Sequence, residues 1–249
     1  MKKFLFSLIA CGVSACTSMA TPTALPTASP TPTSTPTPTV EWFPPTETPM
    51  PAPSQVFTPV PELSDLGEVI FRDDFDRPGN WRLEDTNRGC VNISNNEINL
   101  IIRESGTFLY SVLEEPKFTD FYVEITASPS LCAGKDEYGL MFRADENRSY
   151  YRYSLSCDGE IRMDRVIGGT AFSPQSWLPS SAVPSAAPSE SRLGVWAKGN
   201  TLNFFIDGEL QFSVTDDQLQ QGSFGVFARS VGENAVTVSF TDLVVRELE

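Results

Sequence analysis

The fold is decided by one stretch, Asn200-Thr201-Leu202-Asn203-Phe204-Phe205-Ile206-Asp207-Gly208, in which apolar side chains recur at every second position before an Asp-Gly pair. This period of two is typical of a strand with one buried face, and Asp-Gly supplies the positive φ angles of a two-residue hairpin turn. We therefore expect a strand over 201–206 that pairs with an antiparallel strand over 209–215. On the other side, Gly199-Asn200 predicts a second tight turn, back to a strand over 192–198.

The rest of the chain after Leu66 has the same character. Short apolar runs alternate with Gly, Asn, Asp and Pro, Asp158-Gly159 predicts a third hairpin, and no long stretch has helical spacing. The sequence therefore predicts an all-β domain over 66–249. The other strands are expected over 68–71, 91–94, 97–103, 108–112, 121–127, 139–143, 150–156, 160–166, 222–229 and 235–246.

Alternation divides these strands into two faces. We expect the more apolar phase to form the core between two packed sheets. Its members are Leu140, Phe142, Tyr151, Tyr153, Leu155, Ile161, Met163, Leu193, Val195, Leu202, Phe204, Ile206, Phe224 and Val226. The opposite phase mixes arginines with aromatic residues, which is unusual for a plain solvated face: Met141, Arg143, Arg152, Arg162, Trp196, Phe205, Phe227 and Arg229.

About 180 residues carry a resemblance to a known family. The opening block, flanked by Arg192-Leu193-Gly194-Val195 and by 222–228, together with Phe71-Arg72-Asp73-Asp74-Phe75-Asp76 and 138–143, resembles concanavalin A-like jelly-roll domains, and Val238-Ser239-Phe240-Thr241-Asp242-Leu243 fits the same plan. The branch it resembles most is the one named for 3-keto-disaccharide hydrolases and the family 16 glycosidase-like domains of tethered bacterial proteins. The resemblance implies a curved, antiparallel two-sheet sandwich whose concave face meets carbohydrate. Fold does not imply activity, however.

The first 65 residues have a different composition. Lys2 and Lys3 precede an apolar run that is too short to span a bilayer, which predicts a signal peptide over 1–15. Two lipobox-like stretches end at Cys11 and at Cys16. We prefer Cys16 for lipidation, because cleavage before Cys11 would leave a very short apolar region. The predicted location is therefore extracytoplasmic, at the bacterial cell surface, with a lipid anchor in the cell membrane.

Most of the 20 prolines lie between Pro22 and Pro61, in Thr-Pro repeats. Proline fixes φ and removes backbone donors, so residues 16–65 are expected to form a disordered, polyproline-like tether that lifts the domain from the membrane. A ligand for a proline-binding domain is the alternative.

Charge and composition exclude several functions. The formal net charge is −14, which disfavours binding to a phosphate backbone, so no nucleic acid is expected as a partner. There is no histidine, which removes the commonest general base and every Ser-His-Asp or Cys-His nucleophile system. We expect a monomer and no obligatory cofactor.

The arginine and aromatic phase is the predicted ligand-binding face. Aromatic rings stack on sugar rings, and guanidinium groups bond hydroxyls or uronate carboxylates. The candidate binding residues are Arg143, Arg152, Arg162, Trp177, Trp196, Phe205 and Arg229. The alternative is cross-strand pairing of the arginines with acids such as Asp164 and Glu160. The Ser/Pro/Ala-rich segment 168–191 is long for a connection and could form a rim or lid over this face.

Acidic residues give two weaker hypotheses. Family 16 enzymes carry Glu-x-Asp-x-Glu on the catalytic strand, and this pattern is absent here; the pairs Asp136-Glu137 and Asp145-Glu146 are interpreted as solvated charge. No catalytic residue is therefore assigned. A second group could converge between the first and last strands and hold a structural calcium ion: Asp73, Asp74, Asp76 and Asp242. The alternative is turn chemistry, in which Asp74 and Asp76 bond the loop 77–80.

Three cysteines lie within the domain, where export permits a disulfide. The hairpin of 139–143 with 150–156 turns near Glu146-Asn147, which places Cys157 opposite Asp136. Cys132 is only four residues from Asp136, so we predict a Cys132–Cys157 bridge and a buried, unreactive thiol at Cys90.

Three classes of function remain. The preferred one is a non-catalytic module that binds a glycan or cell-wall polysaccharide. An enzyme that acts on modified disaccharides would require clustered acids on the concave face. A structural or protein-interaction domain would pair its arginines with acids across strands and leave no open groove.

Overall fold

The computed structural model describes residue 63 and residues 66–248, and these form two antiparallel sheets. The predicted signal peptide, the lipidation site Cys16 and most of the tether lie outside the described residues. No helix in the described part of the chain is long and apolar enough to cross a membrane. The strands are β1 (Leu66–Asp73), β2 (Glu84–Thr86), β3 (Gly89–Ser94), β4 (Glu97–Ile102), β5 (Phe108–Val112), β6 (Phe121–Leu131), β7 (Glu137–Ala144), β8 (Tyr150–Ser156), β9 (Glu160–Ile167), β10 (Thr170–Pro179), β11 (Ser191–Lys198), β12 (Thr201–Ile206), β13 (Glu209–Thr215), β14 (Ser223–Arg229) and β15 (Val236–Leu248).

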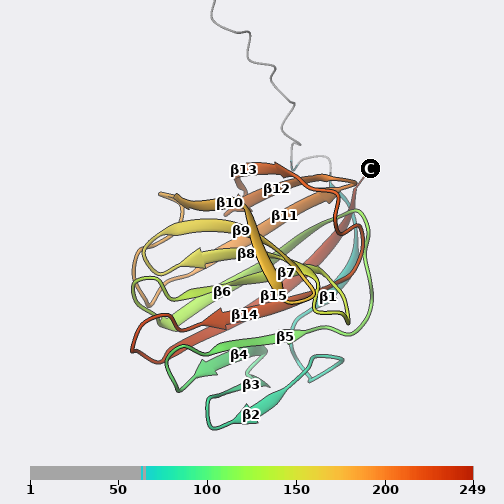
Figure 1. Ribbon diagram of the computed structural model, residues 1–249. Helices are drawn as coiled ribbons and strands as arrows, with labels where there is room; N and C mark the ends of the chain where they lie inside the picture. Colours follow the sequence, from blue (N-terminus) through green and yellow to red (C-terminus); the bar gives the residue numbers. More distant parts are fainter. Residues whose placement is uncertain (1–62, 64–65, 249) are drawn as a thin grey trace, which may run out of the picture. The chain divides into compact units, whose positions relative to one another are not determined.

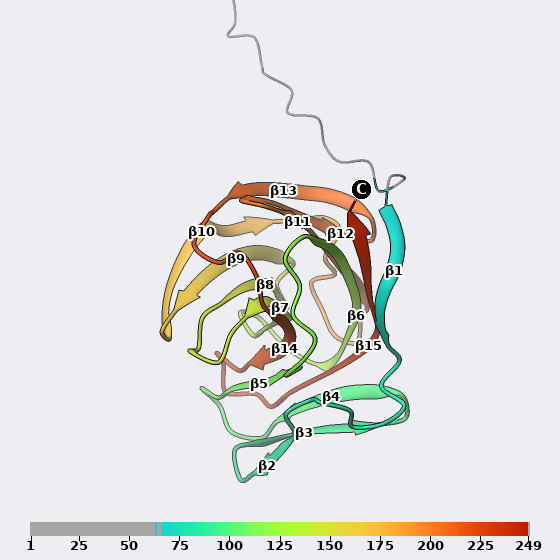
Figure 2. The ribbon, with the colours of Figure 1, turned by 90° about the vertical axis from the view of Figure 1, so that its right-hand side faces the viewer.

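The two sheets pack as a curved sandwich (Figure 1). One has nine strands, in the order β13-β12-β11-β6-β15-β4-β3-β2 with β1 added alongside β15; the other has six, in the order β10-β9-β8-β7-β14-β5. Figure 2 shows the nine-stranded sheet as an outer arc from β13 round to β2, with the six-stranded sheet inside it. The outward face of the six-stranded sheet is therefore concave.

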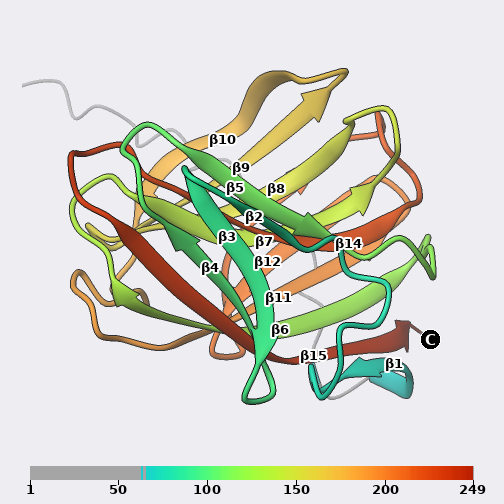
Figure 3. The ribbon, with the colours of Figure 1, turned by 90° about the horizontal axis from the view of Figure 1, so that it is seen from below.

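The first and last strands are neighbours, as expected. Asp73 of β1 lies opposite Leu243 of β15 in an antiparallel pair, and the same two strands lie side by side in Figure 3. Their pairing places the beginning and the end of the domain next to each other in one sheet.

The core lies between the sheets, and its predicted composition is confirmed. All fourteen residues assigned to the apolar phase are fully buried in one continuous hydrophobic cluster that extends from Phe75 to Val245. Burial of this apolar surface is the main stabilising contribution to the fold. Both sheets and this cluster lie between β1 and β15, so the experiments below use the domain 66–249.

The hairpin chemistry behaves as predicted in two of three turns. Gly199-Asn200 joins β11 to β12 and Asp207-Gly208 joins β12 to β13 as two-residue turns, with positive φ at Gly199, Asp207 and Gly208. The β8–β9 connection has one residue more: Gly159 takes a positive φ, and its amide donates to the Ser156 carbonyl.

The predicted disulfide is present. In the β7–β8 hairpin, Glu137 pairs with Ser156, the Cys157 amide donates to the Asp136 carbonyl, and Cys132 and Cys157 are bonded with their Cα atoms 5.9 Å apart. The bridge joins the loop before β7 to the end of β8. Cys90 is a buried free thiol in β3, as expected.

Two strands were not predicted. β2 is a three-residue strand at the end of the nine-stranded sheet. β10 occupies the first half of segment 168–191, which was expected to be a rim or lid; it is instead the edge strand of the six-stranded sheet. Pro174 and Pro179 fit this place, because an edge strand tolerates a missing donor, and the register with β9 shifts on either side of Gln175.

Four tyrosines of the sandwich are buried, and burial raises the pKa of each. The pKa of Tyr138 rises to about 12, and those of Tyr122, Tyr151 and Tyr153 are also raised, with burial the largest cause in every case. In the unfolded chain a tyrosine titrates near 10. Above that pH the unfolded state therefore binds fewer protons than the folded state.

This difference predicts a loss of stability in alkali. The tyrosine contribution is complete below pH ~10 and is lost as the pH rises towards the folded pKa, with a slope that approaches about 1.4 kcal/mol per pH unit for each group. Urea unfolding of domain 66–249 at pH 8 to 11.5 should show the free energy of unfolding falling above pH 10. The free energy of unfolding of Tyr138→Phe should fall less steeply with pH. An equal slope in the variant and the unchanged domain would contradict the role given to Tyr138.

Candidate functional site

The concave face of the six-stranded sheet carries a chain of arginines and carboxylates from four strands. Arg229 of β14 donates to Glu137 of β7 at 3.3 Å, and Arg162 of β9 donates to the other Glu137 oxygen at 2.8 Å. Arg162 also lies 3.0 Å from Asp164, which in turn binds Arg152 of β8. Three arginines thus share two carboxylates, which leaves a local surplus of positive charge.

Asp164 is the centre of this network. One of its oxygens accepts from Arg152 Nε at 3.0 Å, from Arg152 Nη2 and from Arg162 Nη2, and the other accepts from the Ser173 hydroxyl of β10. The Asp164 side chain is only 1% exposed. A buried carboxylate requires such partners, because its removal from water is otherwise costly.

Aromatic rings lie beneath the guanidinium groups. Arg152 lies over the rings of Phe108 and Phe227, at 5.6 and 5.3 Å from their centroids, and Arg162 lies over Trp177 at 4.3 Å. These cation–π contacts fix the arginine planes above the sheet. Phe108 also extends the row towards Tyr110, whose ring centroid is 5.7 Å away.

The expectation that all seven candidate residues share one face is wrong. Arg152, Arg162, Arg229 and Trp177 do lie together on the six-stranded sheet. Trp196 of β11 and Phe205 of β12 are on the outward face of the other sheet, where Phe205 packs edge-on against Tyr122. Alternation separates inside from outside, but it does not tell which of two sheets a strand joins.

Arg143 departs from the predicted face for a different reason. Between Met141 and Ala144, β7 carries one residue more than β14, and Arg143 takes a positive φ of 49°. This bulge turns the side chain away from the concave face and buries it completely. Gly222 permits the close approach, since a Cβ there would lie 2.3 Å from the Arg143 carbonyl carbon.

Once buried, Arg143 binds three loops. Its guanidinium donates to the carbonyls of Thr119, Gly199 and Leu219 at 2.8 to 2.9 Å, and Asp120 lies 3.8 Å away. These carbonyls belong to the connections before β6, between β11 and β12, and between β13 and β14. Arg143 is therefore a structural residue that joins the two sheets at one end.

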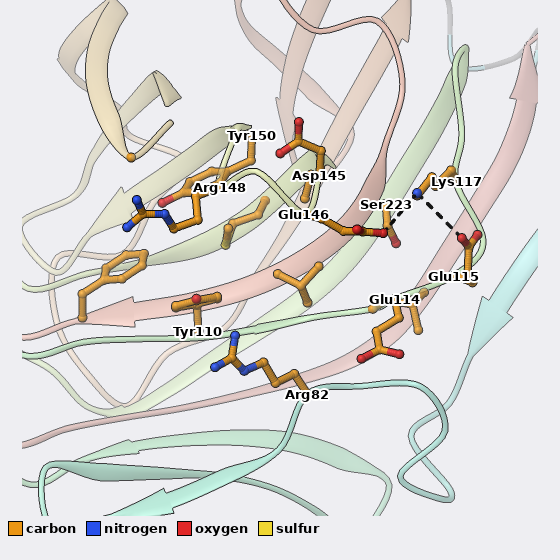
Figure 4. Close-up of a pocket in the computed structure, with 16 residues that line it drawn as sticks. Arg82, Tyr110, Glu114, Glu115, Lys117, Asp145, Glu146, Arg148, Tyr150 and Ser223 are labelled. Atoms are coloured by element: carbon orange, nitrogen blue, oxygen red, sulfur yellow. Dashed lines mark ion pairs between the residues drawn. The ribbon is translucent and has the colours of Figure 1, made fainter. Parts of the chain in front are cut away.

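Beside the arginine network, the concave face opens into a groove of about 730 Å³ (Figure 4). Its lining includes Phe108, Tyr110, Met141 and Tyr150 from β5, β7 and β8. This volume lies in the range of small-ligand sites, and rings with a few polar groups are the usual lining of such sites.

Polar side chains occupy the walls of the groove. Arg82 lies over the Tyr110 ring at 5.7 Å, and Lys117 lies 3.8 and 3.9 Å from Glu115 and Glu146. Figure 4 shows Lys117, Glu115, Glu146 and Ser223 together, apart from the arginines. The groove thus has a carboxylate-rich part and an arginine-rich part.

A tight turn positions one of these arginines. The Asp145 carboxylate accepts from the amides of Asn147 and Ser149 at 2.8 and 2.9 Å, and its own amide donates to the Ser149 carbonyl. Arg148 takes a positive φ in this turn, and its guanidinium carbon would lie 3.6 Å from a Cβ at Gly169. Figure 4 shows the Arg148 side chain beside Tyr150.

Ser223 adds a polar group that has no partner in the protein. The residue lines the groove, but its hydroxyl is buried and makes no hydrogen bond within the described part of the chain. A buried hydroxyl without a partner costs free energy.

Comparison with solved structures agrees with the two-sheet architecture of the domain. Carbohydrate binding module CBM66 from Bacillus subtilis superposes with a TM-score of 0.55 at 17% identity, over 68% of this chain and 96% of that one. The catalytic domain of an endo-1,3-β-glucanase (laminarinase) from Thermotoga petrophila RKU-1 gives 0.53 at 10% identity, over 73% and 98%. A Bacillus subtilis protein of unknown function with a galectin-like fold gives 0.54 at 16% identity, over 73% and 96%. The domain is a concanavalin A-like jelly roll.

The sequence itself matches no protein-family profile and no curated protein. At these low identities the superpositions establish the jelly-roll fold and no more. The prediction of an all-β, two-sheet antiparallel sandwich is confirmed.

The structure corrects the sequence-based interpretation of several acidic residues of the domain. Asp136 and Glu137 are not solvated charge, because both are buried: Asp136 accepts from the amides of Ala133, Val231 and Gly232, and Glu137 binds two arginines. Glu160, named as an arginine partner, binds Lys135 instead. The prediction of Asp164 as a partner is confirmed.

The four aspartates suggested for calcium do not form a cluster. Asp73 accepts from the Phe75 amide and from Trp81 Nε1, both at 2.8 Å, while Asp74 and Asp76 are exposed and lie near Arg72 and Arg77. No group of three or more metal-binding side chains occurs among the described residues. The alternative, in which Asp74 and Asp76 bond the loop 77–80, is also wrong, because the turn bonds are made by Asp73.

The residues that line the groove were not among the binding residues predicted from the sequence. Phe108 and Tyr110 alternate with Leu109 and Ser111 in a strand that was predicted correctly, so their shared face could have been noticed. Arg82, Lys117 and Arg148 are in connections, where no periodicity indicates direction. Only the packing of β5 beside β14 brings these segments together.

Proposed function

We propose that the domain is a non-catalytic carbohydrate-binding module whose site is the concave groove. The observation that carries this proposal is the lining: the rings of Phe108, Tyr110 and Tyr150 form an apolar floor, and cationic and acidic side chains surround it. Sugar rings stack their C–H faces on aromatic side chains while their hydroxyls bond polar groups. The named similarity of the fold to a carbohydrate binding module supports the same function.

We further propose that the module works at the outside of a bacterial cell, as a monomer. A lipid on Cys16 would anchor the chain in the membrane, and the Pro/Thr-rich residues that follow would carry the module towards its glycan. Both elements are inferred from the sequence. A radiolabelled fatty acid incorporated into the full chain, and lost in Cys16→Ser but not in Cys11→Ser, would support the anchor.

The arginine network argues against hydrolysis at the centre of the face. A glycosidase uses two carboxyl groups, and one of them must carry a proton to the leaving group. Glu137 and Asp164 are the carboxylates in the network, and each is buried and bound by two arginines. Because their oxygens already have partners, neither is free to reach the leaving group of a bound sugar.

One observation favours the enzyme as a second candidate. Four carboxyl groups line one part of the groove, as an enzyme acting on modified disaccharides would require: Glu114, Glu115, Asp145 and Glu146. Asp145 is occupied by its turn, and Glu146 is 92% exposed beside Lys117. Incubation with each bound glycan, followed by mass spectrometry, would detect products if this candidate were correct.

A purely structural domain fits the structure less well. Its arginines should be paired with acids across strands, and they are. It should also leave no open groove, whereas a cavity of about 730 Å³ is present beside the paired arginines.

A glycan array with domain 66–249 tests the proposal. We expect specific binding that Tyr110→Ala and Tyr150→Ala each weaken by about tenfold or more, since loss of a stacked ring costs on the order of 1–2 kcal/mol. Trp196→Ala is the matched control, because Trp196 is an aromatic residue on the other sheet. Binding that Trp196→Ala removes and Tyr110→Ala leaves intact would place the site elsewhere, and absence of signal for all glycans would refute the proposal.

A further inference from the structure

The groove is not uniform in charge, and the difference along it points to a class of sugar. Figure 4 shows Arg148 and Tyr150 on one side of Tyr110 and Arg82 on the other, with Glu115, Lys117 and Glu146 grouped apart from them. One part therefore offers two guanidinium groups around aromatic rings. The other part offers carboxylates around one lysine.

The two guanidinium groups are available to a ligand. Arg82 and Arg148 are exposed, and neither forms an ion pair within residues 63 and 66–248. The Arg82 guanidinium lies over the Tyr110 ring. Lys117, by contrast, lies within 4 Å of two carboxylates, so its charge is already offset.

The arginine-rich part continues into the arginine network. Arg152 lies over Phe108, which also lines the groove, and the network itself has three arginines for two carboxylates. Arg82, Arg148 and the three network arginines therefore follow one another along this face, while the four carboxyl groups of the groove line its other part, in a chain whose formal net charge is −14. Positive charge concentrated in this way on an acidic protein favours an anionic ligand at this place.

The shape of the ligand follows from the lining. The rings of Tyr110, Tyr150 and Phe108 fit the apolar faces of sugar rings, and the carboxylates in the acidic part of the groove can accept hydrogen bonds from sugar hydroxyls. The arginines require a planar acceptor that guanidinium groups bind well, which a carboxylate provides. A neutral sugar would leave both guanidinium groups without an anionic partner.

We propose that the groove binds an acidic oligosaccharide, with a uronate carboxylate between Arg82 and Arg148 and neighbouring hydroxyls at the carboxylate-rich part. This inference rests on the proposed function and adds the class of glycan. It also assigns specificity to two residues outside the paired network.

Calorimetric titration of domain 66–249 tests the inference. The probes are an oligogalacturonate of five residues, its fully methyl-esterified form and a sulfated oligosaccharide of similar length. We expect the oligogalacturonate to bind at least about tenfold more tightly than the other two, and its affinity to fall as the salt concentration rises. Arg82→Gln and Arg148→Gln should each remove about tenfold of the oligogalacturonate affinity and change methyl-ester binding by less than about twofold.

The control variant is Arg192→Gln. Arg192 is an exposed arginine of β11 on the other sheet, so its replacement changes the net charge equally and should leave the affinity unchanged. Equal binding of the methyl ester, or of the sulfated probe, would overturn the uronate assignment and leave the glycan-binding proposal standing. If none of the three probes binds but the glycan array shows specific binding of neutral glycans, the uronate assignment alone falls. If the array also shows no binding, both proposals fall.

Discussion

Arg143→Met should lower the free energy of unfolding by about 3–5 kcal/mol. The variant removes the donor to three carbonyls, those of Thr119, Gly199 and Leu219, in a place from which water is excluded. Each buried acceptor left without a partner costs about 1–3 kcal/mol. The desolvation of Arg143 itself, which lowers the pKa of its guanidinium, is relieved and offsets part of that cost.

Urea unfolding of domain 66–249 measures the effect. Arg143→Lys should recover only part of the stability, because one ammonium group lacks the fork that spans three acceptors. Arg192→Met on the exposed face of β11 serves as a control and should be nearly neutral. A loss below about 1 kcal/mol in Arg143→Met would show that the three loops do not depend on this residue.

Asp164→Asn is expected to have the second large effect, again about 3–5 kcal/mol, because it leaves Arg152 and Arg162 close together without their shared carboxylate. The side chain keeps its shape, so packing is unchanged and the loss reports charge. The measurement is again urea unfolding, at low and at high salt.

A double variant distinguishes the buried pair from an ordinary surface contact. Arg152→Met with Asp164→Leu replaces the pair by apolar side chains of similar size and should be less destabilising than Asp164→Asn alone. Asp85→Asn, which breaks the exposed pair with Arg103, should change stability little. If Asp164→Asn behaved like Asp85→Asn, the network could not be the framework of the concave face.

Sequence periodicity predicts the core well, because successive side chains of a strand point to opposite faces of the sheet. In a strand with one buried face, the apolar phase is therefore the buried one. Leu140, Phe142, Tyr151 and Phe204 were assigned to the core from their phase alone, and all are buried. The register of the β7–β8 hairpin could also be predicted from the sequence, because a turn near Glu146 fixes which residues pair. That register led to the prediction of the Cys132–Cys157 disulfide, which is present. Local rules decide these features.

The candidate site depends on information that periodicity does not contain. Arg143 was misplaced because one extra residue in β7 reverses the direction of its side chain. Trp196 has the same phase as Arg152 but belongs to the other sheet. β10 was missed because its prolines are typical of a loop, and only its position at a sheet edge makes them acceptable.

The groove could not be predicted without knowing how strands far apart in the sequence pair. Tyr110, Tyr150 and Arg82 come from segments whose approach depends on β5 pairing with β14 and β14 with β7. The β5–β14 pairing joins residues 113 to 121 positions apart, and the β14–β7 pairing joins residues 79 to 92 positions apart. No local pattern predicts them, so the site could be sought on the concave face but not located along it.

The most direct test of the central claim is an NMR titration of 15N-labelled domain 66–249 with a panel of neutral and uronate-containing oligosaccharides at millimolar concentration. Backbone amide shifts report weak binding and its position together. We predict that the perturbed amides cluster in β5, in β14 and in the β7–β8 connection around Arg148, and that the outward face of β11 and β12 is unaffected. Perturbation centred on Trp196, or no perturbation by any member of the panel, would contradict the assignment of the concave groove as a glycan-binding site.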